Sequence, residues 1–277
     1  SFPRRAYGED GPLIGFPLVY QYLTTMRADA FPAGADDLLG VRGRGWYVPY
    51  PSGIFPPGAG LPLVSGTRWD TGVELRAAHG PFEVALAVTR GTVSDPLFED
   101  TNDGRQVASR LAYRPGPGWT IGVSAAEGRY LADSATSTLP ASLGDDYRQQ
   151  ALGLDLEHAR GHLVLRAEVV ASRWSVPPVG SAPLTEPLPA MGAFAEGRYR
   201  VAPGWTLGAR VDRLEFGDIQ GTRGWDSWDA DVTRVEAGVA FTPRRRLSLR
   251  VVYQYNWRDT ERFSNEEFVA AQLGIWF

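Results

Sequence analysis

The sequence predicts an all-β fold: a transmembrane, antiparallel, up-and-down β-barrel of about 12–16 strands with a long N-terminal loop segment. Three observations lead to this prediction. Apolar and polar residues alternate with period 2 along most of the chain. The alternating segments are each about ten residues long, enough to cross a bilayer at a tilt of about 45°. The connections between them are alternately short and long, as tight turns on one side and larger loops on the other require.

The first part of the chain, residues 1–67, lacks this alternation and is rich in proline and glycine. Its many aromatic residues argue against disorder. We therefore interpret 1–67 as an ordered, loop-rich segment that lies on the extracellular side or folds into the lumen and narrows it. Residues 16–26 are expected to form a short helix or a strand, and 36–39 a single helical turn.

The second part, residues 68–277, is expected to form one barrel domain. The alternation predicts strands over 68–77, 81–92, 105–114, 118–128, 147–159, 162–174, 191–202, 204–216, 231–242, 246–257 and 267–277. Long connections are expected near 93–104, 129–146, 175–190, 217–230 and 258–266. The related stretches 114–123 and 201–210 indicate two similar hairpins, each with a Trp at the periplasmic interface; a propeller repeat is the alternative.

The last strand carries the most specific signal. Residues 268–277 read F-V-A-A-Q-L-G-I-W-F, with one apolar row that ends on Phe277. This ending resembles the C-terminal signature of porin-like bacterial outer-membrane β-barrels, in which Leu273, Ile275 and Phe277 would be the signal read by the barrel assembly machinery. The resemblance implies the outer membrane of a Gram-negative bacterium, contact with outer-membrane lipid and lipopolysaccharide, and no cofactor.

Each strand has two chemically different faces. Alternation alone also suits a soluble sandwich, but the uniform strand length, the flanking aromatics and the terminal Phe277 favour a membrane barrel with its apolar face outside. The residues expected to face lipid are Phe82, Val84, Leu86, Leu247, Leu249, Val251, Leu273 and Ile275. The residues expected to line the pore are Glu74, Arg110, Asp155, Arg166, Glu168, Glu196, Arg198, Arg210, Asp212, Arg234, Glu236, Arg250 and Gln254.

The expected function is a porin-like channel for the passive diffusion of small polar solutes, because about twelve or more strands leave an aqueous lumen unless it is plugged. The near balance of inward positive and negative charges, with Arg234 and Glu236 expected beside Arg250, argues against strong ion selectivity. The alternative is a structural or partner-binding barrel, such as a surface scaffold or a sleeve for another protein. A homo-oligomer or a protein partner is compatible with either function.

Bulk composition excludes other classes. A mean hydropathy of −0.22 and 22% charged residues do not suit a bundle of membrane helices. The net charge of −4 argues against a nucleic-acid partner. The three histidines, His79, His158 and His162, lie at or beside expected turns, and no nucleophile can be assigned to them, so we do not expect an enzyme.

Two loop clusters are weaker candidates for binding. Asp95, Glu99, Asp100 and Asp103 could hold Ca²⁺ in an extracellular loop, although solvated turn residues are the favoured interpretation. Trp225 and Trp228, which alternate with aspartates in 224–231, could contact a sugar.

Strand parity gives a last expectation. Single-chain bacterial barrels have an even number of strands, and eleven are counted here. Either residues 13–23 form a twelfth strand, which Pro17 disfavours, or the natural protein has further residues before Ser1.

Overall fold

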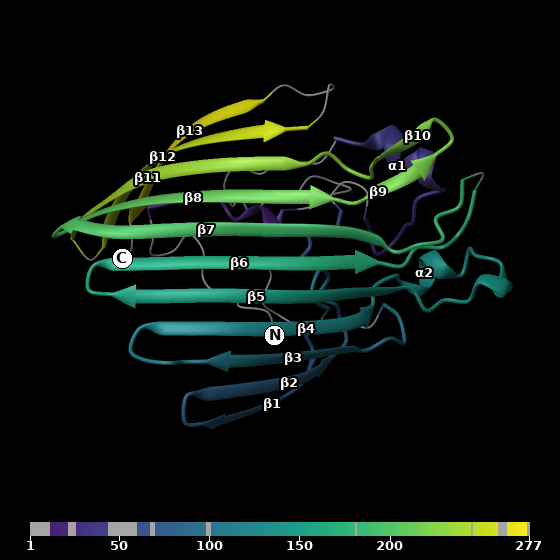
Figure 1. Ribbon diagram of the computed structural model, residues 1–277, viewed down its shortest axis with the longest axis horizontal. Helices are drawn as coiled ribbons and strands as arrows, with labels where there is room; N and C mark the ends of the chain where they lie inside the picture. The colour runs from purple at the N-terminus through teal and green to yellow at the C-terminus, as the bar shows by residue number, and fades with distance from the viewer. Residues whose placement is uncertain are drawn as a thin grey trace.

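The dominant feature of the computed structural model is one antiparallel sheet of eleven strands in the order β1-β2-β3-β4-β5-β6-β7-β8-β11-β12-β13 (Figure 1). The structure describes residues 12–21, 26–43, 60–66, 70–97, 101–180, 182–244, 246–259 and 265–275. The strands of this sheet are β1 (Gly72–His79), β2 (Phe82–Thr89), β3 (Gln106–Tyr113), β4 (Trp119–Arg129), β5 (Arg148–Arg160), β6 (Leu163–Trp174), β7 (Leu188–Ala202), β8 (Trp205–Phe216), β11 (Val232–Arg244), β12 (Leu247–Arg258) and β13 (Glu266–Ile275).

The predicted strands and the all-β, up-and-down fold class are confirmed, since each of the eleven predicted ranges coincides with one strand of this sheet. One predicted loop is wrong. Residues 217–230 contain β9 (Asp218–Gly221) and β10 (Gly224–Ser227), which pair only with each other. Strands of four residues are too short to show a clear alternation, so the pattern did not reveal them.

The connections alternate in length as expected, with the short ones gathered at one end of the sheet and the long ones at the other (Figure 1). We call these the tight-turn end and the long-loop end. Gly161 and His162 alone join β5 to β6, and Gly161 has φ of 58°. That left-handed conformation is accessible to glycine at little cost, and it lets the chain reverse within two residues.

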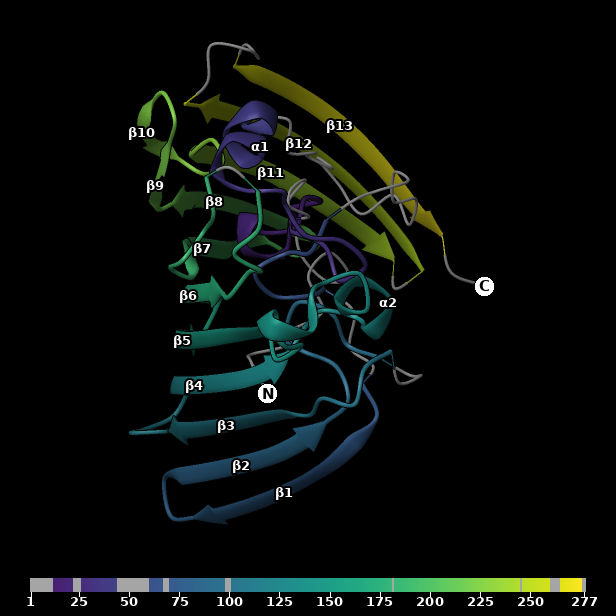
Figure 2. The same cartoon turned by 90° about the vertical axis from the view of Figure 1, so that its right-hand side faces the viewer.

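The sheet curves into an open trough (Figure 2). Among the described residues, β1 and β13 are its two edges and do not pair with each other. Any further strand that a total of 12–16 requires is therefore not among them. The N-terminal segment lies on the concave side of the sheet (Figure 2), and Arg210 and Glu236 hydrogen-bond to its residue Gly15, so we call the side that carries them the inner face. The opposite side, where Val251 and Leu273 are exposed, is the outer face.

The N-terminal segment contains little regular structure. Its described residues form a 3₁₀ turn, η1 (Leu18–Tyr20), and a short helix, α1 (Ala35–Val41), where a single helical turn was expected. Residues 12–21 form no strand, so the described part of 13–23 does not supply the twelfth strand. Loops at the long-loop end carry α2 (Asp133–Thr136) and η2 (Ala141–Leu143).

No helix in the described part of the chain has the length and apolar character needed to cross a membrane.

Candidate functional site

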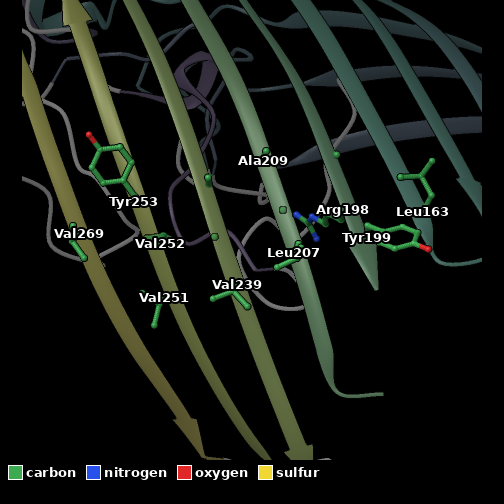
Figure 3. Close-up of a pocket in the computed structure, with 14 residues that line it drawn as sticks. Leu163, Arg198, Tyr199, Leu207, Ala209, Val239, Val251, Val252, Tyr253 and Val269 are labelled. Atoms are coloured by element: carbon green, nitrogen blue, oxygen red, sulfur yellow. The ribbon is translucent and has the colours of Figure 1, made fainter. Parts of the chain in front are cut away.

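The outer face exposes an apolar surface. The predicted lipid-facing side chains lie on it, with exposed fractions of 40% to 61%, except that Leu247 is half-buried. A shallow apolar hollow of about 650 Å³ lies on this face, and its lining includes Leu207, Ala209, Val239 and Tyr253 (Figure 3). Contact of this surface with lipid stays a prediction, as does the assembly role of Leu273 and Ile275; Phe277 lies outside the described residues.

Aromatic side chains form a row at the tight-turn end of the sheet. Trp119 stacks on His158 with 4.0 Å between ring centroids, and Trp205 stacks on Phe241 with 4.3 Å. His162 meets Tyr199 edge to face. The two tryptophans of the related hairpins therefore occupy equivalent positions, and these two histidines are packed in the aromatic row.

The inner face carries the predicted pore-lining residues, and its centre is an ion cluster around Arg210. In the register of the sheet, Arg210 lies directly opposite Glu196 on β7 and Glu236 on β11. Its Nη2 donates to Glu236 Oε2 at 2.6 Å, its Nε to Asp212 Oδ2 at 2.9 Å, and its Nη1 to Glu196 Oε2 at 3.4 Å. All four side chains are buried. One cation thus bridges three strands and contacts three carboxylates, of which Glu196 is also paired with Arg198.

A second ion cluster lies on β3, β4 and β5. Arg110 binds both carboxylate oxygens of Asp155, with 2.8 Å between Nη2 and Oδ1, and also donates to Ser124. Glu168 on β6 lies opposite Asp155 and accepts a hydrogen bond of 3.0 Å from the hydroxyl of Tyr20. The other carboxylate oxygen of Glu168 is buried and has no hydrogen-bond partner among the described residues.

The remaining predicted pore-lining residues continue this pattern in both directions along the sheet. Arg166 pairs with Glu157 at 2.9 Å, and Arg198 pairs with Glu196 at 2.6 Å. Glu74 contacts Arg76 on the exposed edge strand β1.

The expected pairing of Arg234 and Glu236 with Arg250 is wrong. Gln254 lies opposite Glu236, and Arg234 donates to Asn256 at 2.7 Å. Arg250 lies opposite Ala240 and Gln272. It is therefore too far along β12 to reach Arg234 or Glu236.

Most charged side chains of the inner face lie in its middle and toward the tight-turn end, as Arg110, Arg166 and Arg210 do. Toward the long-loop end most inward side chains are apolar or small and pack with the N-terminal segment and the loops, and the buried amides of Gln106 and Gln149 lie among them. The larger of two buried clusters there contains Leu18, Met26, Leu38, Leu63, Leu131, Trp174, Leu188, Leu214, Phe216, Trp228 and Val232. The second contains Val19, Tyr20, Val64, Ala87, Ala108, Ala126, Ala151, Val170 and Phe194.

The N-terminal segment is held on the inner face through its backbone. The amides of Ile14 and Gly15 donate to Glu236 Oε1 at 3.0 and 3.1 Å, and Arg210 Nη2 donates to the carbonyl of Gly15 at 3.0 Å. Glu236 Oε2 also accepts from Arg210. This one ion pair therefore binds two backbone N–H groups and one backbone carbonyl of residues 14–15.

Two further residues of the inner face also bind the N-terminal segment. Asp212 Oδ1 accepts from the amide of Leu18 at 3.2 Å, and Arg234 Nη1 donates to the carbonyl of Phe16 at 3.1 Å. Hydrogen bonds that involve a charged group are the stronger class. Several residues predicted to line a pore therefore bind this segment.

Glycines on the inner face make room for the N-terminal segment. A Cβ at Gly192 would lie 3.1 Å from Val19 Cβ and 3.3 Å from Leu63 Cδ2, and one at Gly208 would collide with Pro12. Sequence reasoning missed these glycines. The available signal was a glycine at the inward position of neighbouring strands, which indicates close approach of another backbone.

The acidic loop gives no support for a metal site. Glu99 and Asp100 lie outside the described residues, and Asp103 is exposed. In the described part of the chain, no three His, Asp or Glu side chains come together in a way that could hold a metal ion. Burial and the neighbouring carboxylates of Asp70 and Asp29 raise the pKa of the Asp95 carboxyl to about 6.

The two tryptophans of 224–231 have different environments. Trp228 is buried, packs against Trp174 and Phe216, and donates to the carbonyl of Pro189 at 2.7 Å, so it cannot stack on a sugar. Trp225 is exposed on the β9–β10 hairpin.

Comparison with known proteins gives structural matches only. No protein-family model and no curated protein matches the sequence. The fold is similar to outer-membrane-expressed OmpT of Vibrio cholerae, with a TM-score of 0.52 and 14% identity over 74% of this chain and 65% of that one. It is also similar to an anion-selective porin from Comamonas acidovorans, with a TM-score of 0.51 and 10% identity over 73% of this chain and 57% of that one. The chain spans less than two thirds of the length of either protein.

Proposed function

We propose that this chain, whose fold is that of the porin-like outer-membrane β-barrels, forms part or all of an outer-membrane channel for the passive diffusion of small polar solutes. The observation that carries the proposal is the contrast between the two faces of the sheet. An exposed apolar outer face suits the hydrocarbon core of a bilayer, and a charged inner face suits an aqueous path.

The accessible charges lie toward the tight-turn end. The side chains of Arg110 and Arg166 keep 16% and 19% of their surface exposed, whereas Arg210 keeps 1%. Polar solutes would therefore meet paired charges of both signs, which favours weak ion selectivity. The proposal assigns no catalytic step and no cofactor.

The filled long-loop half of the inner face favours a second candidate, a structural or partner-binding barrel without transport. Two apolar clusters occupy that region, and an apolar filling offers no path to a hydrated solute.

Planar-bilayer recording separates these two candidates. The purified protein should insert and give stepwise conductance with little preference between K⁺ and Cl⁻, because accessible charges of both signs line the inner face. Protein that is demonstrably inserted yet produces no steps would overturn the diffusion proposal in favour of the structural one.

A more specific prediction concerns the N-terminal segment, which we propose narrows the channel. Gly192→Leu places a side chain where Val19 and Leu63 now lie, so it should displace the segment from the wall. Single-channel conductance should rise by roughly 1.5-fold or more, because the open cross-section of the pore grows.

The matched control is Gly197→Leu on the same strand. Gly197 lies on the outer face, where a Cβ would meet only Leu165 Cδ2, at an ordinary 3.4 Å. The conductance of this control should equal that of the wild type. An unchanged conductance in a folded Gly192→Leu variant would show that the segment does not set the width of the channel.

A further inference from the structure

The tight-turn end of the sheet carries uncompensated positive charge. Arg160, Arg200, Arg244 and Arg246 lie in the tight connections or on the strand ends that flank them, and all four are exposed. Among the described residues, no carboxylate pairs with any of these four arginines. No aspartate or glutamate occurs in the connections and flanking residues 79–81, 114–118, 160–162, 200–204 and 243–246. We call this end the basic mouth.

The long-loop end has the opposite sign, and we call it the acidic mouth. In the long connections, aspartates and glutamates outnumber arginines. Two exposed arginines there, Arg173 and Arg223, have no carboxylate partner within the described part of the chain and offset part of the negative charge. The exposed carboxylates that no described arginine pairs with are those of Asp36, Asp37, Asp103, Glu186 and Asp218.

The middle of the inner face adds little net charge between the two mouths, because its ions are paired. Arg110 is paired with Asp155, and Arg166 is paired with Glu157. The mouths are also far apart. A strand such as β8 has 12 residues. Such a strand is about 40 Å long, whereas the field of a charge decays over about 10 Å in salt of about 0.1 M. Each mouth therefore acts separately on the ions that enter it.

We propose that the two mouths select ions of opposite sign, anions at the basic mouth and cations at the acidic mouth, so that the channel passes more current at one polarity than at the other. The inference rests on the proposed function, because it needs a conducting path between the two ends.

The direction of the larger current follows from the positions of the charges. When the long-loop side is positive, cations enter through the acidic mouth and anions enter through the basic mouth, so both mouths fill with ions. The opposite voltage draws each ion first into the mouth of its own sign, and both mouths are depleted.

Selectivity should depend on the direction of a salt gradient. In symmetric salt the two mouths offset each other, so the overall preference between K⁺ and Cl⁻ stays weak. In a gradient the dilute side decides, because concentrated salt screens the charges of the other mouth. The channel should prefer cations when the long-loop side is dilute and anions when the tight-turn side is dilute.

Single-channel recording of the purified protein in planar bilayers tests this inference. In about 0.1 M KCl, the currents at about 100 mV should differ roughly twofold or more between the two polarities. In about 1 M KCl, where the Debye length is about 3 Å, the ratio should approach one. The side that gives cation preference when dilute should be the side that gives the larger current when positive. This relation holds for either orientation of the inserted protein, and the reverse relation would contradict the assignment of the mouths.

A charge reversal at the basic mouth tests the source of the effect. Neither Arg200 nor Arg244 has a side-chain hydrogen bond or an ion pair among the described residues, so the variants should retain the fold. Arg200→Glu combined with Arg244→Glu should lower the current ratio in about 0.1 M KCl to below about 1.3 and abolish the anion preference. The matched control, Arg200→Lys combined with Arg244→Lys, retains the charge and should behave as the wild type does.

Neutralisation of the acidic mouth by Glu186→Gln combined with Asp218→Asn should also lower the current ratio. Channels that conduct equally at both polarities in about 0.1 M KCl would overturn this inference and leave the proposed function intact. A wild-type ratio in the double glutamate variant would overturn it as well, since the arginines of the basic mouth would not be its source. The absence of any conductance steps would overturn both proposals.

Discussion

Replacing Arg210 with leucine should destabilise the fold by about 3–5 kcal/mol, the cost of removing one partner from a buried ion pair. The variant would leave Glu196, Asp212 and Glu236 buried together without their shared cation. It would also remove the hydrogen bond from Arg210 to the carbonyl of Gly15, so the N-terminal segment should loosen with the wall. Unfolding of the lipid-refolded protein in urea, followed by tryptophan fluorescence, measures the free-energy change.

Arg213→Leu is the control for this prediction. Arg213 is on the same strand and also contacts two carboxylates, but its side chain is 42% exposed, and exposed ion pairs contribute about 0–1 kcal/mol. The double variant Arg210→Leu with Glu236→Gln should recover part of the loss, because one unpaired buried charge disappears while the amide oxygen of the glutamine still accepts from Ile14 and Gly15. Equal destabilisation by Arg210→Leu and Arg213→Leu would contradict the central role of the buried cluster.

Replacing Val251 with arginine should cost about 2–4 kcal/mol, the penalty for an arginine on the lipid face near the midplane of a bilayer. Val251 lies near the middle of β12 on the outer face and is 40% exposed between Val239 and Ala271. The same urea titration in lipid vesicles measures this effect.

Val201→Arg is the matched substitution at a different depth. Val201 is also exposed but lies near the end of β7, beside the connection Pro203–Gly204. An arginine near the interface costs about 0–1 kcal/mol, since its side chain reaches the headgroups. If the two variants lost the same stability, the outer face would not be a membrane surface with a defined midplane.

The sequence alone determined the eleven strands of the large sheet and its two faces, but not the β9–β10 hairpin within 217–230. The predicted strand 162–174 is β6, Leu163–Trp174, and the predicted strand 246–257 is β12, Leu247–Arg258. The period-2 alternation is a local property of the chain, and the glycine turn at 161 is local as well. The alternation and the turn can both be recognised from the sequence without knowing which strands are neighbours.

Part of the candidate site could also be predicted. The predicted charged residues do lie on one face, because alternation decides the side of the sheet on which each residue lies. The pairing of Arg234 and Glu236 with Arg250 could not be predicted correctly. A shift of register moves every cross-strand partner, and the position of Arg250 depends on how far β12 slides along β11.

Only the tertiary structure decided what the inner face does. The hydrogen bonds from Ile14 to Glu236 and from Leu18 to Asp212 join residues 222 and 194 positions apart. No local pattern specifies which distant backbone reaches a buried carboxylate. The same holds for the long-loop half of the inner face, where Leu214 and Val232 point inward and are covered by the N-terminal segment and the loops. Alternation gives the direction of a side chain, whereas its partner depends on the path of the whole chain.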